Sequence, residues 1–458
     1  MTNSRSDAFV FLGATGDLAH KQIFPALQGL IRDEGFDIPI VGVAKAGWTL
    51  DQLKDRAKDS LEKHGGVDPV AFPRLLSLLR YVDGDYNDPE TFVQLAKELG
   101  QAQRPLHYLA IPPNLFGPVA ENLAKLCSSG NARLVVEKPF GRDLESAREL
   151  SRTLHQYFAE ENLYRIDHFL GKEPVQNILY MRFANPIFEP IWNRDHIRCI
   201  QITMAEDFGV EDRGRFYDGV GALLDVVQNH MLQVVANLTI DPPTGEEHDA
   251  IRDRKSELMR AVRTLQPDAV VRGQYEGYRS VPGVARGSTV ETFVAVKLEI
   301  ESWRWAGVPI YIRAGKMLPV TCTEATVEFK RPPRETFGEL APTSSAHMRI
   351  RVSPDFAIGQ GLRVKIPGER MVGRDVELDL HTQELNNAMP PYQRLLGDAI
   401  RGNAEQFSRQ DLVEAQWRIV EPILGDVTPF YSYLPGTWGP EESAQLIGSD
   451  DYWIDPVL

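Results

Sequence analysis

The first 165 residues alternate short apolar runs with longer amphipathic stretches. Four such pairs begin with AFVFLG, IPIVGVA, RPLHYLAIPP and ARLVVEKPF, and a segment with helical spacing follows each of them. Strands that alternate with helices in this way predict βαβ units around a parallel sheet. We therefore expect residues 1–165 to form a doubly wound, Rossmann-type α/β domain.

The pattern changes after residue 165. One long helical stretch, GALLDVVQNHMLQVVANL, is followed by period-2 segments such as TVETFVAVKLEI, ATVEFK and MRIRVS. This alternation is typical of antiparallel strands with one face on a core. Residues 166–458 are therefore expected to form a larger α+β domain with a broad, mainly antiparallel sheet.

The charge of the chain narrows the classes of partner. A formal net charge of −14 argues against nucleic acid or an anionic membrane as partner, because the overall field would repel their phosphates. The sequence has no signal-peptide pattern and no uncharged run long enough to span a bilayer, so we expect a cytoplasmic protein. Its cysteines, Cys127, Cys199 and Cys322, stand apart and predict buried apolar residues rather than a disulfide or metal site.

The first predicted strand runs into a glycine-containing turn, FLGATGDLA. In such a turn the first glycine allows a sharp bend, the second allows close approach to a pyrophosphate, and a small third residue lets the helix pack closely. A tight turn without a ligand is the alternative. The candidate cofactor-binding residues are Gly13, Ala14, Thr15, Gly16, Asp17 and Leu18.

Two lysines follow predicted strands at the edge where open α/β sheets hold ligands. Lys45 ends the second strand, at the position where NAD enzymes carry an acid, and a cation there suits the 2′-phosphate of NADP. Lys138 follows the strand of ARLVVEKPF and is a candidate for the ligand crevice. The alternative for both is a solvated surface lysine.

Two further segments concentrate polar groups. RIDHFLGKEP combines acids, bases and a histidine in ten residues, which by itself is usual for a charged surface loop. In the long helix, His230 has valines at i−4, i−3 and i+4, so burial is expected to depress its pKa. A hydrogen-bonded core histidine is the usual explanation, but Asp225, Gln228 and Asn229 share its two turns, and a nearby carboxylate would make His230 a general base.

Together these motifs resemble the glucose-6-phosphate dehydrogenase family. The resemblance covers nearly the whole chain through GATGDLA, EKPFG, RIDHFLGKE, DVVQNH, WRWAGVPIYIRAGK and PYQRLLGDAIRGN, in that order. It implies oxidation of glucose 6-phosphate at C1 to 6-phosphogluconolactone with hydride transfer to NADP, the first step of the oxidative pentose phosphate pathway. It also implies weaker use of NAD, no metal, and a homodimer or homotetramer.

The resemblance assigns roles by matched position. His230 would take the proton of the C1 hydroxyl, and Asp167 would orient His230. The matched substrate-binding residues are His168 and Lys172 at the phosphate, Glu206 and Asp225 at the sugar hydroxyls, and Lys138, Lys316 and Thr321.

Four positions depart from the family pattern. Phe169 stands where many members have tyrosine, Gln22 and Thr321 where basic residues are frequent, and Lys45 where arginine is usual. Because lysine lacks the bidentate fork of arginine, the departures predict weaker phosphate binding and a less strict preference for NADP.

Two other functions fit parts of the sequence. One is another Rossmann sugar oxidoreductase, of the glucose-fructose oxidoreductase and inositol dehydrogenase group, against which RIDHFLGKE and DVVQNH argue. The other is a non-catalytic dinucleotide sensor, against which the presence of both Asp167 and His230 argues.

Overall fold

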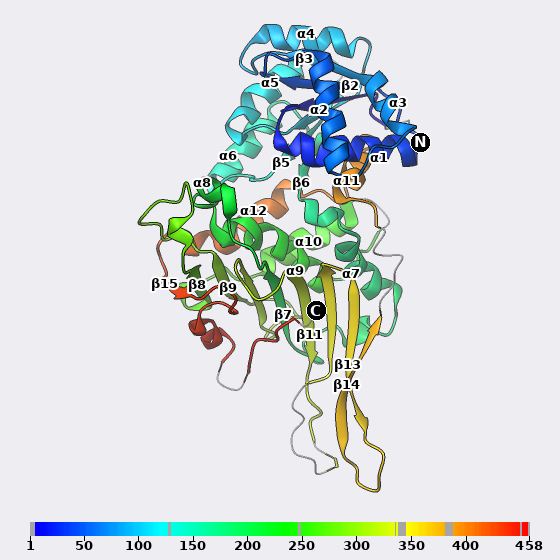
Figure 1. Cartoon of the computed structure of the whole chain (residues 1–458). Coiled ribbons are helices and arrows are strands. Elements are labelled where there is room, and N and C mark those ends of the chain that lie inside the picture. The colour runs from blue at the N-terminus through cyan, green and yellow to red at the C-terminus, as the bar shows by residue number, and fades with distance from the viewer. Residues whose placement is uncertain are drawn as a thin grey trace. The chain divides into compact units, whose positions relative to one another are not determined.

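The computed structural model describes residues 5–126, 130–245, 249–334, 336–337, 345–380, 388–448 and 451–456 (Figure 1). The chain divides into two compact units. The first contains Met1–Lys172, Pro243–Asp253 and Met389–Glu414, and the second contains Glu173–Pro242, Arg254–Ala388 and Ala415–Leu458.

The first unit is built on a parallel sheet in the order β3-β2-β1-β4-β5-β6. Its strands are β1 (Ala8–Leu12), β2 (Ile40–Ala44), β3 (Leu79–Asp83), β4 (Pro105–Leu109), β5 (Arg133–Glu137) and β6 (Leu163–Ile166). The order reverses direction at β1 and β4, which is the arrangement of a Rossmann fold. The predicted α/β domain is therefore confirmed.

Helices cover both faces of this sheet. They include α1 (Phe24–Glu34), α2 (Leu50–Lys63), α3 (Ala71–Leu78), α4 (Pro89–Leu99), α5 (Phe116–Leu126), α6 (Leu144–His155) and α11 (Pro391–Arg401). Every residue of β1 is buried, with Phe9 and Phe11 in the core on one face and Ala8, Val10 and Leu12 in the core on the other. An apolar run without alternation is what a strand buried on both faces requires.

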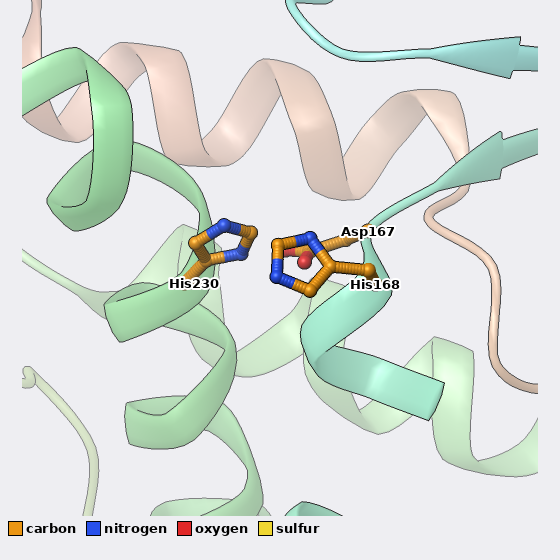
Figure 2. Close-up of side chains that lie close together, drawn as sticks. All are labelled: Asp167, His168 and His230. Carbon is orange, nitrogen blue, oxygen red and sulfur yellow. The ribbon is translucent and has the colours of Figure 1, made fainter. Parts of the chain in front are cut away.

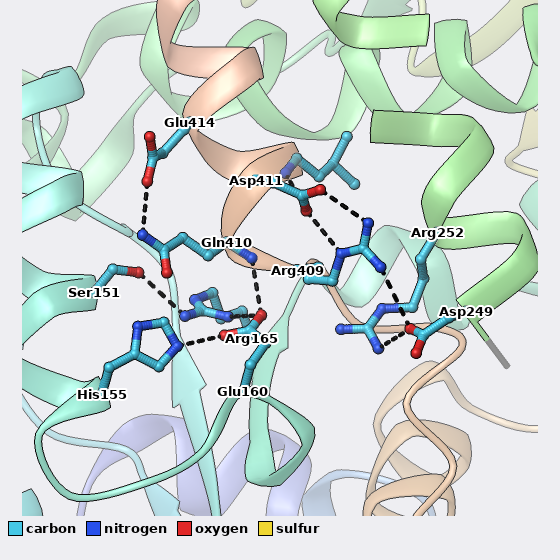
Figure 3. Close-up of polar contacts among 11 residues, drawn as sticks. Ser151, His155, Glu160, Arg165, Asp249, Arg252, Arg409, Gln410, Asp411 and Glu414 are labelled. Atoms are coloured by element: carbon cyan, nitrogen blue, oxygen red, sulfur yellow. Dashed lines mark hydrogen bonds and ion pairs between the residues drawn. The ribbon is translucent and has the colours of Figure 1, made fainter. Parts of the chain in front are cut away.

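Segments from late in the sequence complete the first unit. α11 packs against α1, and Leu395 and Ile400 lie in the same core as Phe9. The chain after α11 is held to β6 by polar contacts (Figure 3). The buried Arg165 of β6 pairs with Glu160 at 2.7 Å, and Glu160 accepts a hydrogen bond from Gln410 N at 2.9 Å.

The second unit is built on a nine-stranded mixed sheet in the order β14-β13-β12-β11-β7-β10-β9-β8-β15. Its strands are β7 (Ile197–Ala205), β8 (Val270–Tyr275), β9 (Phe293–Leu298), β10 (Ile310–Gly315), β11 (Cys322–Phe329), β12 (His347–Ser353), β13 (Ala357–Lys365), β14 (Gly373–Leu380) and β15 (Phe430–Tyr433). Among the described strands of this nine-stranded sheet, only the pairs β7/β10 and β8/β15 are parallel. The predicted broad, mainly antiparallel sheet is thus confirmed.

The predicted long helix of this unit is present in two parts. A π-helix, η7 (Leu223–Met231), continues into α9 (Leu232–Thr239). The other helices are α7 (Glu173–Ala184), which packs on β12, the short α8 (Gly214–Tyr217), and α10 (Asp249–Ala261) and α12 (Gln410–Val420), both of which begin with residues of the first unit.

The cysteines and the helix lengths bear on two sequence expectations. Cys199 and Cys322 are buried free thiols, as predicted, and Cys127 lies outside the described residues. Among the described residues, the helices lack the length and apolarity to cross a membrane.

Candidate active site

The predicted cofactor turn joins β1 to the first helix, with residues 13–18 forming the turn and the helix start. Gly13 has φ +88°, and a Cβ atom on it would lie 2.1 Å from the carbonyl oxygen of Ala110. A side chain is therefore excluded at Gly13 by both conformation and space. Ala19 is fully buried against the sheet, which lets the helix start close to β1.

A tyrosine that the sequence did not indicate braces this turn. Gly13 N donates to Tyr86 Oη at 2.8 Å and lies 2.9 Å from the carbonyl oxygen of Val43, to which Tyr86 Oη donates at 3.1 Å. Burial raises the pKa of Tyr86 to about 12, so the hydroxyl stays protonated and keeps its donor role. Only the fold reveals this contact, since Gly13 and Tyr86 are 73 residues apart.

Lys45 directly follows β2 at the carboxyl edge of the sheet. Its Nζ atom lies 2.7 Å from Asp85 Oδ2, and its side chain is 70% exposed. The hydrogen bond that Lys45 donates to the Asp85 carboxylate raises the pKa of Lys45. The expected cation is therefore at the strand end, but a carboxylate accompanies it.

At the end of β5, Glu137 and Lys138 are both half-buried. Burial raises the pKa of Glu137 to about 7, although the hydroxyls of Tyr108 and Tyr392 oppose the shift by hydrogen bonding to the carboxylate. Tyr392 is the second residue of α11. The motif PYQRLLGD, for which no role was predicted, thus supplies a ring and a hydroxyl next to Glu137.

Asp167 and His168 directly follow β6 (Figure 2), and Lys172 is the C-cap residue of the short 3-10 helix that begins at His168. Asp167 is 3% exposed and caps a short 3-10 helix, since its Oδ1 accepts from Phe169 N at 3.0 Å. The ring of His168 stacks on Tyr392 with centroids 6.3 Å apart.

Phe169 supports the lysine of this motif. Lys172 Nζ lies 4.2 Å from the centre of the Phe169 ring, a cation–π distance. Burial lowers the pKa of Lys172, and the charge of Asp167 opposes this. The phenylalanine that replaces the frequent tyrosine therefore packs under the cation, and offers no hydroxyl of its own.

In the second unit, His230 lies near the end of η7 and is 2% exposed (Figure 2). The predicted burial is confirmed, but the α-helical spacing assumed for its neighbours is replaced by π-helical spacing. Because a π-helix bonds residue i to residue i+5, Asp225 and His230 lie one turn apart on the same helix. Such π-turns are frequent at functional sites, and the hydrophobic pattern gives no sign of them.

The start of η7 is held by Glu291, another residue that the sequence did not indicate. Glu291 Oε1 lies 3.1 Å from Leu223 N, and Arg272 Nη1 lies 3.7 Å from the other carboxylate oxygen. Gly221 has φ +66°, and a Cβ atom there would lie 2.4 Å from Glu291 Oε1. The carboxylate therefore fits against the chain that leads into the turn of Asp225 and His230.

Glu206 and Lys316 follow the adjacent parallel strands β7 and β10, and their side chains form an ion pair. The Lys316 Nζ atom also lies 5.2 Å from the ring centre of the buried Tyr217. Thr321 is nearby in sequence but bonds elsewhere, since its Oγ1 accepts from Asp207 N at 3.0 Å and donates to the Asp207 carboxylate.

Comparisons with known proteins cover almost the whole chain. The family model described as "Glucose-6-phosphate dehydrogenase, NAD binding domain" matches residues 10–177, and "Glucose-6-phosphate dehydrogenase, C-terminal domain" matches residues 179–454. Glucose-6-phosphate 1-dehydrogenase 1 of Mycobacterium tuberculosis is 45% identical over 99% of this chain and 97% of its own length.

Two solved structures are similar over 99% of both chains. The crystal structure of glucose-6-phosphate 1-dehydrogenase from Mycobacterium avium has a TM-score of 0.93 and 45% identity. A glucose-6-phosphate dehydrogenase in complex with its substrate glucose 6-phosphate has a TM-score of 0.91 and 33% identity.

Proposed function

Because the chain belongs to the glucose-6-phosphate dehydrogenase family, we infer that it oxidises glucose 6-phosphate at C1 to 6-phosphogluconolactone, the first step of the oxidative pentose phosphate pathway. The main support is that the two family models match both units of the chain and cover the motifs RIDHFLGKE and DVVQNH. A different Rossmann sugar oxidoreductase would not match both family models.

His230 is the proposed general base. The reaction removes a proton from the C1 hydroxyl and a hydride from C1, which leaves a carbonyl at C1. A buried imidazole on a π-turn beside Asp225 has few orientations, which suits a base that must meet one hydroxyl. We assign to Asp167 the orientation of the His230 ring and the stabilisation of the imidazolium, as the aspartate of a catalytic triad does.

The sugar phosphate would be held by cations and by polar groups. His168 and Lys172 are the proposed phosphate ligands, supported by their positions around one short 3-10 helix. The lowered pKa of Lys172 reflects burial away from water, where an ammonium ion binds a phosphate more strongly.

The sugar hydroxyls would meet a second set of side chains. Glu206, Asp225 and Lys316 are the proposed ligands there, and Lys138 would bridge the sugar and the cofactor. Thr321 is the weakest assignment, because its hydroxyl already bonds to Asp207.

The first unit fits a nicotinamide dinucleotide. The turn after β1 admits no side chain at Gly13, and a helix begins directly after it, which suits a pyrophosphate. When bound, the dinucleotide accepts the hydride. We propose NADP as the preferred cofactor, with Lys45 at its 2′-phosphate and NAD as the weaker substitute.

The decisive assay combines purified protein with glucose 6-phosphate and either NADP or NAD, and follows nicotinamide absorbance. We expect glucose-6-phosphate-dependent reduction of both, faster with NADP at low concentration. Unphosphorylated glucose is the matched control and should be a poor substrate. Binding of NADP without any turnover would instead favour a non-catalytic dinucleotide sensor.

We further propose that the enzyme is a homo-oligomer, a dimer or a tetramer. The β13/β14 hairpin at the edge of the sheet supports this, because one of its faces is largely apolar and exposed. That face carries Leu362, Val364, Ile366, Val372, Leu378 and Leu380. A second copy would cover it, so Leu378→Asp should lower the mass measured by light scattering, whereas an unchanged mass would exclude this face.

The phosphates of both substrates carry charges that do not cross a bilayer, so the reaction must occur in the compartment that makes them. We propose the cytoplasm, which cell fractionation followed by the absorbance assay would test.

A further inference from the structure

The carboxyl ends of β2 and β3 place two opposite charges side by side. β2 pairs with β3 in parallel, with Ala44 opposite Asp83. Lys45, which follows β2, therefore lies beside the residues that follow β3. Asp85 is two residues beyond β3, and its Oδ2 atom is 2.7 Å from Lys45 Nζ.

Asp85 is held in this position from two sides. Its Oδ1 atom accepts from the backbone nitrogen of Asn87 at 2.9 Å and from the side-chain nitrogen of Asn87 at 3.1 Å. Its own carbonyl oxygen accepts from Thr91 Oγ1 at 2.8 Å. The carboxylate is thus oriented by its own loop and does not depend on Lys45 for its position.

The loop that carries Lys45 is fixed as well. Asp83 Oδ1 accepts from Ala46 N at 3.0 Å and from Gly47 N at 2.8 Å. Tyr86, next to Asp85, bonds to Gly13 in the cofactor turn. Residues 83–86 therefore connect the loop of Lys45, the Asp85 carboxylate and the cofactor turn at the carboxyl edge of the parallel sheet.

In a Rossmann fold the acid that holds the ribose hydroxyls of NAD follows the second strand. Here the cation occupies that place, and an acid follows the neighbouring third strand. A 2′-phosphate must compete with Asp85 for the Lys45 ammonium and lie close to a like charge. A 2′-hydroxyl has no such penalty and can donate to a carboxylate.

We propose that Asp85 is a specificity-determining residue at the ribose end of the cofactor site, which weakens the hold of Lys45 on NADP and supports the use of NAD. This inference rests on the proposed function. It predicts a dual-specificity enzyme in which cofactor choice depends on the balance of these two side chains.

The test is Asp85→Asn, which keeps the Oδ1 acceptor for Asn87 and removes the charge. The ratio of kcat/KM for NADP to that for NAD should rise about tenfold, through a gain for NADP of about threefold to tenfold and a loss for NAD. The control is Glu62→Gln, which removes one charge from an ion pair within α2 and should leave the ratio unchanged.

A binding experiment without turnover makes the test independent of catalysis. Calorimetry with adenosine 2′,5′-bisphosphate and with 5′-AMP should show that Asp85→Asn tightens only the bisphosphate, with a gain that shrinks as salt is raised. An unchanged ratio of kcat/KM, or equal changes for both nucleotides, would overturn the role of Asp85. Absence of turnover with either cofactor in the native enzyme would instead refute the proposed function.

Discussion

Replacing Gly13 by alanine is expected to damage both stability and cofactor binding. The left-handed conformation at φ +88° costs an L-residue about 1–2 kcal/mol. The new Cβ atom would also lie 2.1 Å from the Ala110 carbonyl oxygen, which is backbone in the tightly packed turn after β4. Overpacking of this kind costs about 1–3 kcal/mol, so we expect a total loss of about 2–5 kcal/mol.

Gly35→Ala is the matched control for the conformational part. Gly35 ends α1 with φ +62°, and a Cβ atom there would have no neighbour within 4 Å. Gly35→Ala should therefore lower the free energy of unfolding by about 1 kcal/mol, because the stiffer unfolded chain offsets part of the strain.

The two variants can be compared by urea unfolding and by calorimetric titration with NADP. Gly13→Ala should unfold at clearly lower urea than Gly35→Ala and should bind NADP at least tenfold more weakly, because the turn must move to relieve the contact. Equal unfolding midpoints, together with native NADP affinity in Gly13→Ala, would refute the argument.

Three further changes test the site. His230→Asn should lower kcat by about 10²–10⁴-fold and leave the KM for glucose 6-phosphate nearly unchanged, and steady-state kinetics with kcat within a few-fold of native would point to another base. Lys172→Ala should raise the KM for glucose 6-phosphate at least tenfold. Lys125→Ala, which breaks an exposed ion pair on α5, should leave this KM unchanged, and equal effects would reject Lys172 as a phosphate ligand. Glu137 has a folded pKa of about 7, above its ordinary 4.5, so the stability it contributes is full below pH 4.5 and is lost as pH rises through 7. Glu137→Gln should therefore unfold at higher urea than the native protein at pH 8 and show little difference at pH 4.5, and a pH-independent difference would contradict this.

The doubly wound class of the Rossmann unit and the position of its glycine turn could be predicted because their signals are local, whereas β3 and β6 were not among the four predicted strands and the strand order was not predicted. Short apolar runs indicate which segments are strands, and a glycine between a strand and a helix indicates a turn. The burial of His230 followed in the same way from its valine neighbours. These features depend on residues within about one turn of each other.

The contacts that tune the site could not be read from the sequence. Tyr86 reaches Gly13, and Tyr392 reaches His168, across separations that only the folded chain closes. The π-turn at His230 keeps the apolar pattern of an α-helix, so periodicity could not reveal it. Asp85 follows β3, the strand that pairs with the one before Lys45, and a charge at the end of one strand does not indicate which residues follow the neighbouring strand.

The division of the first unit among three parts of the chain has a consequence during translation. Leu395 and Ile400 of α11 fill the same core as Phe9, and the last segment of the unit ends at Glu414. A ribosome that has made the first 172 residues has therefore not yet made a complete Rossmann unit. We expect the nascent chain to expose apolar surface around α1 until nearly the whole protein has been synthesised, and to depend on chaperones during that interval.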